Sequence, residues 1–490
     1  MINIVNIILC FIFLLYNLKL FQQSSYFISR NYLNYYYKNY KFLFIYIIIL
    51  IINIIFKIYI LEFFLFVFLI IFLIYTTNKK RILKINFTKR LIRLLIVSTI
   101  LLLISNYILN TYSLLIINII IYASNLLLFP LERFIYNKYK QKLKMELKRF
   151  NGVKIVITGS YAKTTTKHML KDLLSYKYNV FYTEKSYNTP MGLAKSIIGN
   201  LNNLYDICIL EFGACKKNDI RGIRELDNYD IAILTGISNQ HLDTFKTLNN
   251  IINEKMNIIE LLGSKGIGII NCNCQLINDY NIKNNCKVIK YYNNDKEKLY
   301  YKNVNTSNNS LNFDLYYHNK KYPINLGLMG TYNIDNYILC VYTSLLLDLK
   351  IEEIIDQTKY IKPVENRINF KIINDKLSVI NNGYNSNIVG SLENIKSLNN
   401  FKNCFKIIIT PGLVNLGKEN NKSNLLMIDK INEICDLCII VNKKNKKIFI
   451  DNLTIKYLYF DNFIKGYHYI LDNIKENTIL LIENDLTDKY

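Results

Sequence analysis

A short run of residues, ITGSYAKTTT from Ile157 to Thr166, has the composition of a phosphate-binding loop. A buried strand, a turn of small residues and then Lys-Thr at the start of a helix bring backbone N–H groups and the amino end of that helix to one point. Lys163 is expected to reach the β- and γ-phosphates of ATP, and the Thr164 hydroxyl is expected to bind Mg²⁺. The run therefore predicts nucleotide binding.

Seven residues of this loop are predicted to bind the nucleotide: Gly159, Ser160, Tyr161, Ala162, Lys163, Thr164 and Thr165. One of them departs from the usual pattern, because Ala162 stands directly before the lysine, where a glycine is common. Alanine tolerates the left-handed backbone region less well than glycine does. An ordinary strand–helix turn is the alternative interpretation of the loop taken by itself.

The elements that must position this loop begin at Val153, where the sequence changes to alternating α/β segments. Val153–Thr158 has the pattern of a buried parallel strand, and Lys163–Tyr176 has helical periodicity. Ile207–Ala214 is a second apolar strand that ends in Glu211, and an acid in that place lies where an open α/β sheet binds its ligands. We predict an α/β fold, with a central parallel-sheet ATPase domain and a Rossmann-like C-terminal domain.

The order of these and later motifs resembles the Mur ligase family, nearest to the branch that adds D-alanyl-D-alanine to the UDP-N-acetylmuramoyl tripeptide. The resemblance begins at about residue 152 with VITGSYAKTTTK and continues to the C-terminus. It includes TEKSYNTPMG, from Thr183 to Gly192, and the stretch from Ile231 to Lys255. The small UDP-binding domain of that branch is not recognisable here, and apolar segments stand in its place.

This resemblance implies roles for residues around the loop. Asn188 and Thr189 are expected to face substrate or phosphate, and Glu211 is expected to bind Mg²⁺ through hard carboxylate oxygens. His241 matches a second metal-site ligand. Lys255 matches a lysine that the family carbamylates, which turns a cation into an anion that helps to organise Mg²⁺. The predicted catalytic residues are Lys163, His241 and Lys255, and the predicted metal-site residues are Thr164, Glu211, His241 and Lys255.

Two further motifs extend the resemblance towards the C-terminus. GLMGTYNIDN resembles the family's G-x-H-N-x-x-N, so Asn333 and Asn336 are expected near the nucleotide, with Tyr332 in place of the usual histidine. Arg367, in ENRINF, matches an arginine that touches ATP.

The motif NGYNSN departs more strongly from the pattern it resembles. Asn381 and Asn382 stand where the family has a pair of aspartates, one of which usually contacts the ribose. Asn382 can still hydrogen-bond a hydroxyl, with weaker charge assistance. We therefore expect Asn382 to bind the nucleotide.

The reaction implied is the formation of an amide bond. ATP would phosphorylate a substrate carboxylate to an acyl phosphate, an incoming amine would attack it, and phosphate would leave. Lys163 and Mg²⁺ would neutralise charge on the transferred phosphoryl group. The cofactors expected are ATP and Mg²⁺, and the expected partners are a nucleotide-sugar peptide and an amino acid or dipeptide. The C-terminal domain would close over ATP about a hinge near Lys362-Pro363.

Before residue 150 the sequence contains apolar segments near the length of about 20 residues that crosses a bilayer. They are residues 2–18, 42–56, 58–76, 91–105 and 112–129. The first lacks the basic start and small-residue cleavage site of a signal peptide, so it is interpreted as an anchor. The basic loops at Lys38–Lys41, Lys79–Arg93 and Arg133–Arg149 are expected in the cytoplasm. These features predict a multi-pass membrane protein with its catalytic part in the cytoplasm; alternatively, one or two shorter segments lie in the interface.

The net charge of +24 is concentrated in this same region, where the first 150 residues hold 19 Lys and Arg but 3 Asp and Glu. Basic charge beside apolar segments favours an anionic membrane surface, so membrane lipid is the expected partner and nucleic acid is not. The ten cysteines have no disulfide framework, which indicates a reducing compartment.

The organisation expected from these patterns is a chain of three domains: 1–149, 150–361 and 362–490. Other functions remain open. A Mur-type ligase could take another acceptor, such as a lipid-linked precursor, and addition of glutamate to folates is a less favoured family activity. A membrane protein that binds ATP without catalysis is the alternative from another class, and the departures at Ala162, Tyr332, Asn381 and Asn382 favour it.

Overall fold

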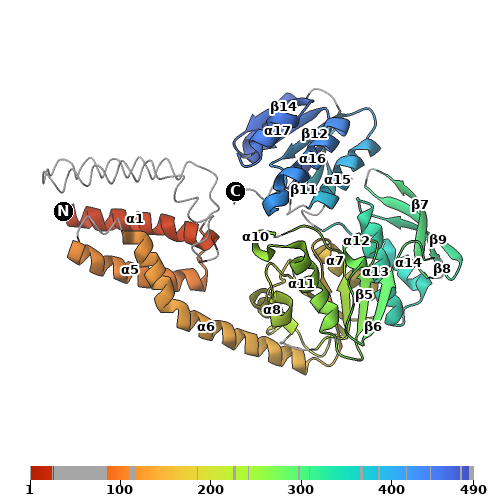
Figure 1. Ribbon diagram of the computed structural model, residues 1–490, viewed down its shortest axis with the longest axis horizontal. Helices are drawn as coiled ribbons and strands as arrows, with labels where there is room; N and C mark the ends of the chain where they lie inside the picture. The colour runs from red at the N-terminus through yellow and green to blue at the C-terminus, as the bar shows by residue number, and fades with distance from the viewer. Residues whose placement is uncertain are drawn as a thin grey trace. The chain divides into compact units, whose positions relative to one another are not determined.

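The computed structural model describes most of the chain and divides it into two compact units, one of Met1–Asn137 and one of Lys138–Thr487 (Figure 1). The described residues are 2–24, 26, 85–109, 116–184, 186–224, 228–240, 242–295, 298–307, 309–364, 368–383, 387–414, 416–441, 443–474 and 477–484.

The first unit contains three described helices: α1 (Ile2–Gln23), α5 (Lys89–Leu109) and α6 (Ile117–Arg149). They overlap three of the five predicted membrane segments, and the segments at 42–56 and 58–76 lie outside the described residues. Among the described helices, α5 over residues 89–108 and α6 are long and apolar enough to cross a bilayer, by length and composition. That the five apolar segments form a multi-pass membrane region stays a prediction.

The second unit begins inside α6. Leu143 and Leu147, in the last turns of this helix, are buried in the same apolar cluster as Val156 of the first strand of the sheet. The end of α6 therefore packs within the second unit, ahead of the boundary expected at residue 150.

A parallel sheet forms the centre of the second unit, with the strand order β2-β3-β1-β4-β5-β6. Its strands are β1 (Val153–Thr158), β2 (Val180–Tyr182), β3 (Ile207–Glu211), β4 (Ile231–Leu234), β5 (Ile267–Asn271) and β6 (Lys287–Tyr291). Strands β1, β3 and β4 are buried along most of their length, because parallel strands are covered by helices on both faces. The strand and the first helix predicted from the sequence are confirmed as elements, although that helix ends two residues earlier than expected, at Leu174.

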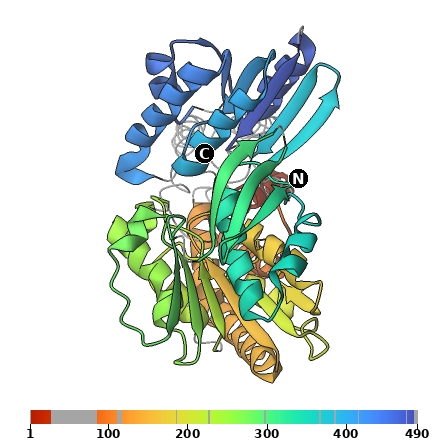
Figure 2. The same cartoon turned by 90° about the vertical axis from the view of Figure 1, so that its right-hand side faces the viewer.

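Helices cover both faces of this sheet (Figure 2). Ile155 and Ile157 of β1 pack with one group of helices, while Val156 between them packs with the other. The first group is α7 (Lys163–Leu174), α13 (Tyr332–Leu346) and α14 (Ile351–Thr358). The second is α8 (Pro190–Ile197), α9 (Asp219–Arg224) and α11 (Leu248–Glu260), with the short α10 (Leu242–Phe245) and α12 (Gln275–Asn278) beside them. This alternation buries both faces of β1 and fixes the loop that follows it.

A small antiparallel sheet joins the same core. It consists of β7 (Tyr300–Thr306), β8 (Leu311–Tyr317) and β9 (Lys320–Leu326). Alternate residues of β8, Leu311, Phe313 and Leu315, are buried in the cluster that contains α7 and α13.

The C-terminal part has its own sheet, in the order β10-β11-β15-β12-β13-β14, and its strands are parallel except for the antiparallel β10. The strands are β10 (Asn369–Asn374), β11 (Leu377–Asn382), β12 (Phe405–Thr410), β13 (Leu437–Val441), β14 (Lys456–Phe460) and β15 (Thr478–Glu483). Helices α15 (Ile388–Ser397), α16 (Asn420–Ile434) and α17 (Lys446–Asn452) cover one face, and α18 (Phe463–Asn473) covers the other. Two short 3₁₀ helices, η2 (Leu398–Asn400) and η3 (Gly417–Glu419), lie between these elements. The expected α/β class is confirmed for both parts.

Candidate active site

The predicted phosphate-binding loop is a tight turn between β1 and α7. Lys163, the first residue of α7, folds back so that its Nζ donates to the Gly159 carbonyl oxygen at 2.7 Å. Gly159 has no room for a side chain, because a Cβ there would lie 2.0 Å from Thr235 Oγ1. The Ser160 N–H donates to the Gly236 carbonyl at 2.8 Å, so the segment after β4 holds the loop. The loop thus lies at the amino end of α7, where that helix end supplies positive potential.

Ala162 occupies the position where the sequence departs from the usual glycine. Its φ of 60° and ψ of −4° place it in the left-handed region, directly before the first residue of α7. A left-handed alanine is strained because its Cβ approaches the following carbonyl oxygen. The turn therefore has the backbone shape that usually selects glycine, and alanine adopts it here.

Glu211, at the carboxyl end of β3, lies beside the loop and is almost fully buried. Thr164 Oγ1 donates to its Oε2 at 2.9 Å, and Asn188 Nδ2 donates to its Oε1 at 3.1 Å. Lys167, which is fully buried one turn after Lys163, approaches Oε2 at 3.4 Å. A carboxylate and a hydroxyl side by side are the hard oxygen donors that Mg²⁺ takes, so the donor set fits that ion.

The charges around Glu211 decide its protonation. Burial opposes the charged form, but Lys167, Lys163 and the hydrogen bonds from Asn188 and Thr164 outweigh it and hold the pKa of Glu211 below its usual value. A carboxylate with a lowered pKa stays ionised through the neutral range. Lys167 was not singled out from the sequence, although its spacing of four from Lys163 places both on one side of a helix.

Lys255, on α11, is buried near the same loop. Its Nζ donates to the Ala214 carbonyl at 3.2 Å. Burial and, next, the charge of Lys163 lower the pKa of Lys255 to about 7. A lysine with this pKa is partly a neutral amine at neutral pH, and a neutral amine is a nucleophile.

Asn188 and Thr189, which follow β2 and were predicted to face the substrate, make different contacts in the structure. Asn188 contacts Glu211, as described above, and its backbone carbonyl accepts from the Gly213 N–H at 2.8 Å. Thr189 is the N-cap of α8, and its Oγ1 accepts from the Gly192 N–H at 3.3 Å. The structure therefore brings Asn188 to the loop and gives Thr189 a hydrogen bond within its own helix. His241 and Arg367 lie outside the described residues.

The two asparagines predicted near the nucleotide are in the first turns of α13 and are both buried. Asn333 Nδ2 donates to the Met329 carbonyl at 2.6 Å, and Asn336 Nδ2 donates to Asn333 Oδ1 at 3.3 Å. Asn336 Oδ1 is buried and has no hydrogen-bond partner in the described part of the chain. An unsatisfied buried acceptor is uncommon and fits a site whose ligand supplies a donor.

Asp335 lies between these asparagines and was not singled out from the sequence. Its Oδ1 accepts from Asn273 Nδ2 at 2.9 Å and from the Tyr291 hydroxyl at 3.1 Å. Burial raises the pKa of Asp335. Burial and, next, Cys274 raise the pKa of the Tyr161 hydroxyl in the loop, and the charge of Asp335 adds to this shift. The sequence signal that could have identified Asp335 was an acidic residue within the motif at 327–336.

In the C-terminal sheet, Asn382 is buried at the carboxyl end of β11. Its Nδ2 donates to both carboxylate oxygens of Glu483, at 3.1 Å each. Asn381 Oδ1 accepts from the Gly383 N–H at 2.9 Å. The sequence did not identify Glu483, which lies on the neighbouring strand about a hundred residues later.

The ten cysteines all lie in the described part of the chain, and no disulfide joins any two of them. No cluster of three or more His, Cys, Asp or Glu side chains that could hold a metal ion occurs among the residues that the structure describes. Thr164 and Glu211 are oxygen donors, the type of ligand that Mg²⁺ takes.

Comparison with known proteins agrees with this geometry. Residues 157–344 match the Mur ligase middle domain. The chain is 27% identical over 340 residues to the UDP-N-acetylmuramoyl-tripeptide–D-alanyl-D-alanine ligase of Buchnera aphidicola subsp. Baizongia pistaciae (strain Bp), which covers 68% of this chain and 72% of that one. It is 29% identical over 349 residues to the ligase of that name from Borreliella burgdorferi (strain ATCC 35210 / DSM 4680 / CIP 102532 / B31), over 67% and 71% of the two chains.

Solved structures show the same fold. The MurF ligase of Thermotoga maritima in complex with ADP aligns with a TM-score of 0.65 at 19% identity, over 72% of this chain and 81% of that one. MurF from Acinetobacter baumannii aligns with a TM-score of 0.63 at 17% identity, over 71% and 77%. Residues 157–344 thus match the middle domain of the Mur ligases, and the chain is similar to ligases of that family in sequence.

Proposed function

We propose that this chain is an ATP-dependent ligase that joins D-alanyl-D-alanine to a muramyl-tripeptide precursor of the cell wall. The γ-phosphoryl group of ATP would pass to the carboxylate of the tripeptide, giving an acyl phosphate and ADP. The free amine of the dipeptide would attack the acyl carbon, phosphate would leave with the C–O bond electrons, and the amine would lose a proton. The names of the two relatives support this choice of substrates.

One observation carries the proposal: the phosphate-binding loop and an ionised acid meet at the end of β3. Thr164, on the first turn of α7, bonds to Glu211 at 2.9 Å, and Lys163 lies over the loop at 2.7 Å from the Gly159 carbonyl. Mg²⁺ bound by these oxygens would neutralise phosphate charge. Lys163 would exchange its loop carbonyl for a phosphate oxygen and stabilise charge there. Asn188 would keep Glu211 oriented.

The test is phosphate release by the full chain in detergent micelles. The wild type should release phosphate only when ATP, the UDP-N-acetylmuramoyl tripeptide and D-alanyl-D-alanine are all present. Lys163→Ala should lower kcat by about 10²–10³-fold, the usual effect of removing one preorganised charge-stabilising group. Lys171→Ala, at a partly exposed position of the same helix, is the matched control and should keep the wild-type rate. ATP binding by the wild type without turnover on these substrates would support the non-catalytic alternative.

Lys255 has the surroundings of a lysine that becomes carbamylated. Its amine is buried and has a pKa of about 7. A neutral amine would add to CO₂, forming an N–C bond and losing one proton, which leaves a carbamate anion. That anion would offset the charge of Lys163 and could supply oxygen ligands to Mg²⁺. Incubation with ¹³C-bicarbonate should give a carbamate NMR signal in the wild type and none in Lys255→Arg. Equal signals in both proteins, or none in either, would refute carbamylation of Lys255.

We also propose that residues 1–137 lie in the membrane and carry the catalytic part on its cytoplasmic side. The apolar residues exposed on one face of α5 are Ile92, Ile96, Ile100, Leu103, Ile104 and Ile108. Polar residues of the same group of helices are instead buried: Asn17, Ser98, Asn106 and Ser124. An apolar exterior around polar interior groups is typical of helices in lipid.

Lysines placed on the exposed face of α5 test this location. A lysine in the middle of a membrane helix costs about 2.5–3.5 kcal/mol for insertion. The double variant Ile100→Lys/Ile104→Lys should therefore leave the membrane fraction during alkaline carbonate extraction, while the wild type stays. Met145→Lys, at an exposed apolar position near the end of α6, is the control and should stay with the membrane. Equal retention of all three proteins would show that the α5 face does not meet lipid.

The membrane location also favours a second acceptor. A ligase held at the membrane meets lipid-linked precursors at high local concentration, because both diffuse in one plane. The phosphate-release assay distinguishes these two acceptors when a lipid-linked tripeptide replaces the UDP-linked one. A higher kcat/KM for the lipid-linked acceptor would assign it as the substrate.

A further inference from the structure

A buried carboxylate lies at the end of the C-terminal sheet, away from the phosphate-binding loop along the chain. Glu483 is the last residue of β15 and is fully buried. It is the register partner of Asn382, the last residue of the neighbouring parallel strand β11. The two side chains therefore leave the sheet side by side, at the edge where parallel α/β sheets bind ligands.

Neutral donors converge on this carboxylate. Asn382 Nδ2 lies 3.1 Å from each oxygen, Ser391 Oγ donates to Oε1 at 2.6 Å, and Asn394 Nδ2 donates to Oε2 at 2.9 Å. Burying an ionised carboxylate is costly unless donors of this kind surround it. Asn394 Oδ1 is buried without a partner in the described part of the chain, so the amide is turned to serve Glu483. Three donor side chains, one from β11 and two from α15, thus surround the carboxylate of Glu483.

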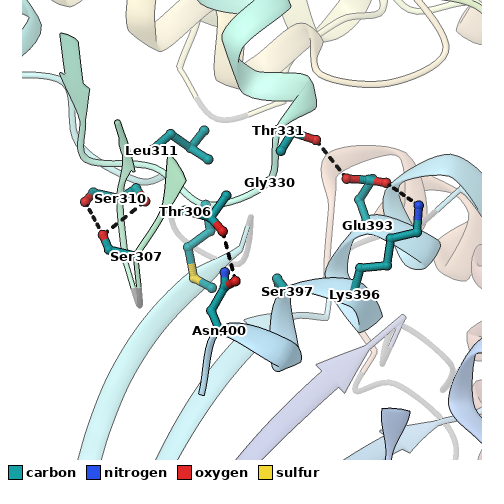
Figure 3. A pocket seen from close by; sticks show the side chains of 11 residues that line it. Thr306, Ser307, Ser310, Leu311, Gly330, Thr331, Glu393, Lys396, Ser397 and Asn400 are labelled. Carbon is teal, nitrogen blue, oxygen red and sulfur yellow. Dashed lines mark hydrogen bonds and ion pairs between the residues drawn. The ribbon is translucent and has the colours of Figure 1, made fainter. Parts of the chain in front are cut away.

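Helix α15, which carries two of these donors, also contacts the central part of the chain. Ser391 and Asn394 are one turn apart on this helix, and Glu393 beside them accepts from Thr331 Oγ1 at 2.7 Å (Figure 3). After the helix, Asn400 Oδ1 accepts from Thr306 Oγ1 at 2.9 Å. These two bonds stand on either side of a cavity of about 130 Å³. Helix α15 thus contacts Thr331 directly before α13, which carries Asn333 and Asn336.

We propose that Glu483 is a positioning residue of the nucleotide site: it fixes the amide of Asn382 and the orientation of α15, which in turn contacts the start of α13. Glu483 is buried and acts through these residues, without touching the nucleotide. The inference rests on the proposed function, because it takes the nucleotide site of that ligase to include Asn382 and Asn333, as expected from the sequence motifs. It adds to that function a carboxylate that holds the C-terminal part of the site.

The substitution Glu483→Gln tests the proposal in the full chain in detergent. Glutamine replaces one of the two carboxylate oxygens by an N–H₂ group, so Asn382 and either Ser391 or Asn394 then direct a donor at a donor. Asn382 and α15 should lose their fixed positions, and KM for ATP should rise roughly tenfold, the effect of about one lost hydrogen bond to a charged group. The value of kcat at saturating ATP should stay close to that of the wild type.

Variants that move the negative charge from position 483 to position 382 distinguish a positioning role of Glu483 from an effect on stability alone. Asn382→Asp alone places a second carboxylate next to Glu483, and like charges at that distance repel, so KM for ATP should rise. The double variant Asn382→Asp/Glu483→Gln has one carboxylate again. Its introduced glutamine amide can donate to the introduced aspartate, while the glutamine oxygen accepts from α15. KM for ATP should then return towards the wild-type value, which is a coupling that independent effects cannot produce.

Asp436→Asn serves as the matched control. Asp436 accepts from the Lys406 backbone N–H at 2.7 Å, on the same sheet but just before β13 rather than after a strand. This change should leave KM for ATP unaltered. If Glu483→Gln lowers the melting temperature but keeps the wild-type KM for ATP, or if the double variant shows no recovery, Glu483 has a structural role alone and the proposal is wrong. A wild type that releases no phosphate refutes the proposed function instead; direct binding of an ATP analogue to the same variants then decides the role of Glu483.

Discussion

Two buried glutamates end parallel strands in different sheets of this protein, and their surroundings differ. Glu211 ends β3 and is approached by the buried ammonium of Lys167 at 3.4 Å and by the Thr164 hydroxyl. Glu483 ends β15 and receives amide and hydroxyl donors from Asn382, Ser391 and Asn394. Among the contacts of the described residues, a buried cation approaches the first carboxylate, whereas directed hydrogen bonds from neutral groups hold the second.

The surroundings of Glu211 suit a site that binds a ligand, whereas those of Glu483 suit a carboxylate that holds neighbouring side chains in place. Lys167 and Lys163 hold the pKa of Glu211 low, which keeps an ionised oxygen pointed at the loop where Mg²⁺ and phosphate are expected. Charge interactions fall off slowly with distance, so they tolerate movement when a ligand arrives. Neutral hydrogen bonds depend steeply on geometry, so the donors at Glu483 specify one arrangement of α15 and β11.

Removal of the cation at the first site should have the largest effect on stability. Lys167→Met leaves Glu211 buried without its nearest ammonium, and breaking a buried ion pair from one side costs about 3–5 kcal/mol. Urea unfolding at neutral pH measures this loss, with Lys171→Met on the same helix as the control, since the Lys171–Asp172 pair is partly exposed and should cost little. A loss below about 1 kcal/mol would mean that charge is not what balances Glu211.

The same variant has a definite pH dependence. The pKa of Glu211 is lower in the folded protein than in the unfolded chain, so its ionised form stabilises the fold above the unfolded pKa. That contribution is lost as the pH falls through the folded pKa. The stability difference between the wild type and Lys167→Met should therefore shrink as the pH is lowered into the acid range, and a difference that stayed constant would contradict the assignment.

Loss of one neutral donor at the second site should have a smaller effect. Ser391→Ala removes the 2.6 Å hydrogen bond to Glu483, and a hydrogen bond to a charged group is worth about 1.5–3 kcal/mol. Ser397→Ala, on the same helix, removes a bond to the Asn394 carbonyl and should cost about 1 kcal/mol, because both partners are neutral. Equal losses for the two variants would show that Glu483 is not held as an ionised carboxylate.

The same comparison explains what could be predicted from the sequence. The site around Glu211 is built from short-range patterns: β1, the loop and α7 follow one another, and Lys163, Thr164 and Glu211 occupy the positions that the motifs indicated. These elements were predictable because strand periodicity and loop composition are local properties of the chain. Lys255 was identified through the family resemblance, and the structure places it on α11, which follows β4 after the short helix α10.

The site around Glu483 was not predictable by these means. Asn382 was found through a motif, but its partner lies on β15, which pairs with β11 across about a hundred residues of chain. Strand order in a parallel sheet is set by tertiary packing, so no local pattern indicates this neighbour. Asp335 and Lys167 were missed for a different reason, because each is a charged residue on a helix and only burial distinguishes it from a solvated one.

The smallest effect on stability is expected at Ala162, the strained residue of the loop beside Glu211. Its φ of 60° costs an alanine about 1–2 kcal/mol, while glycine loses about 0.5–1 kcal/mol more entropy on folding, so Ala162→Gly should stabilise the fold by about 0.5–1 kcal/mol. Urea unfolding measures the change, and Gly159→Ala is the control in the same loop. Gly159 is required for space, since a Cβ would meet Thr235 Oγ1 at 2.0 Å, so its replacement should destabilise the protein. If Ala162→Gly also destabilised the fold, packing of the Ala162 methyl group would contribute more to stability than relief of the backbone strain does.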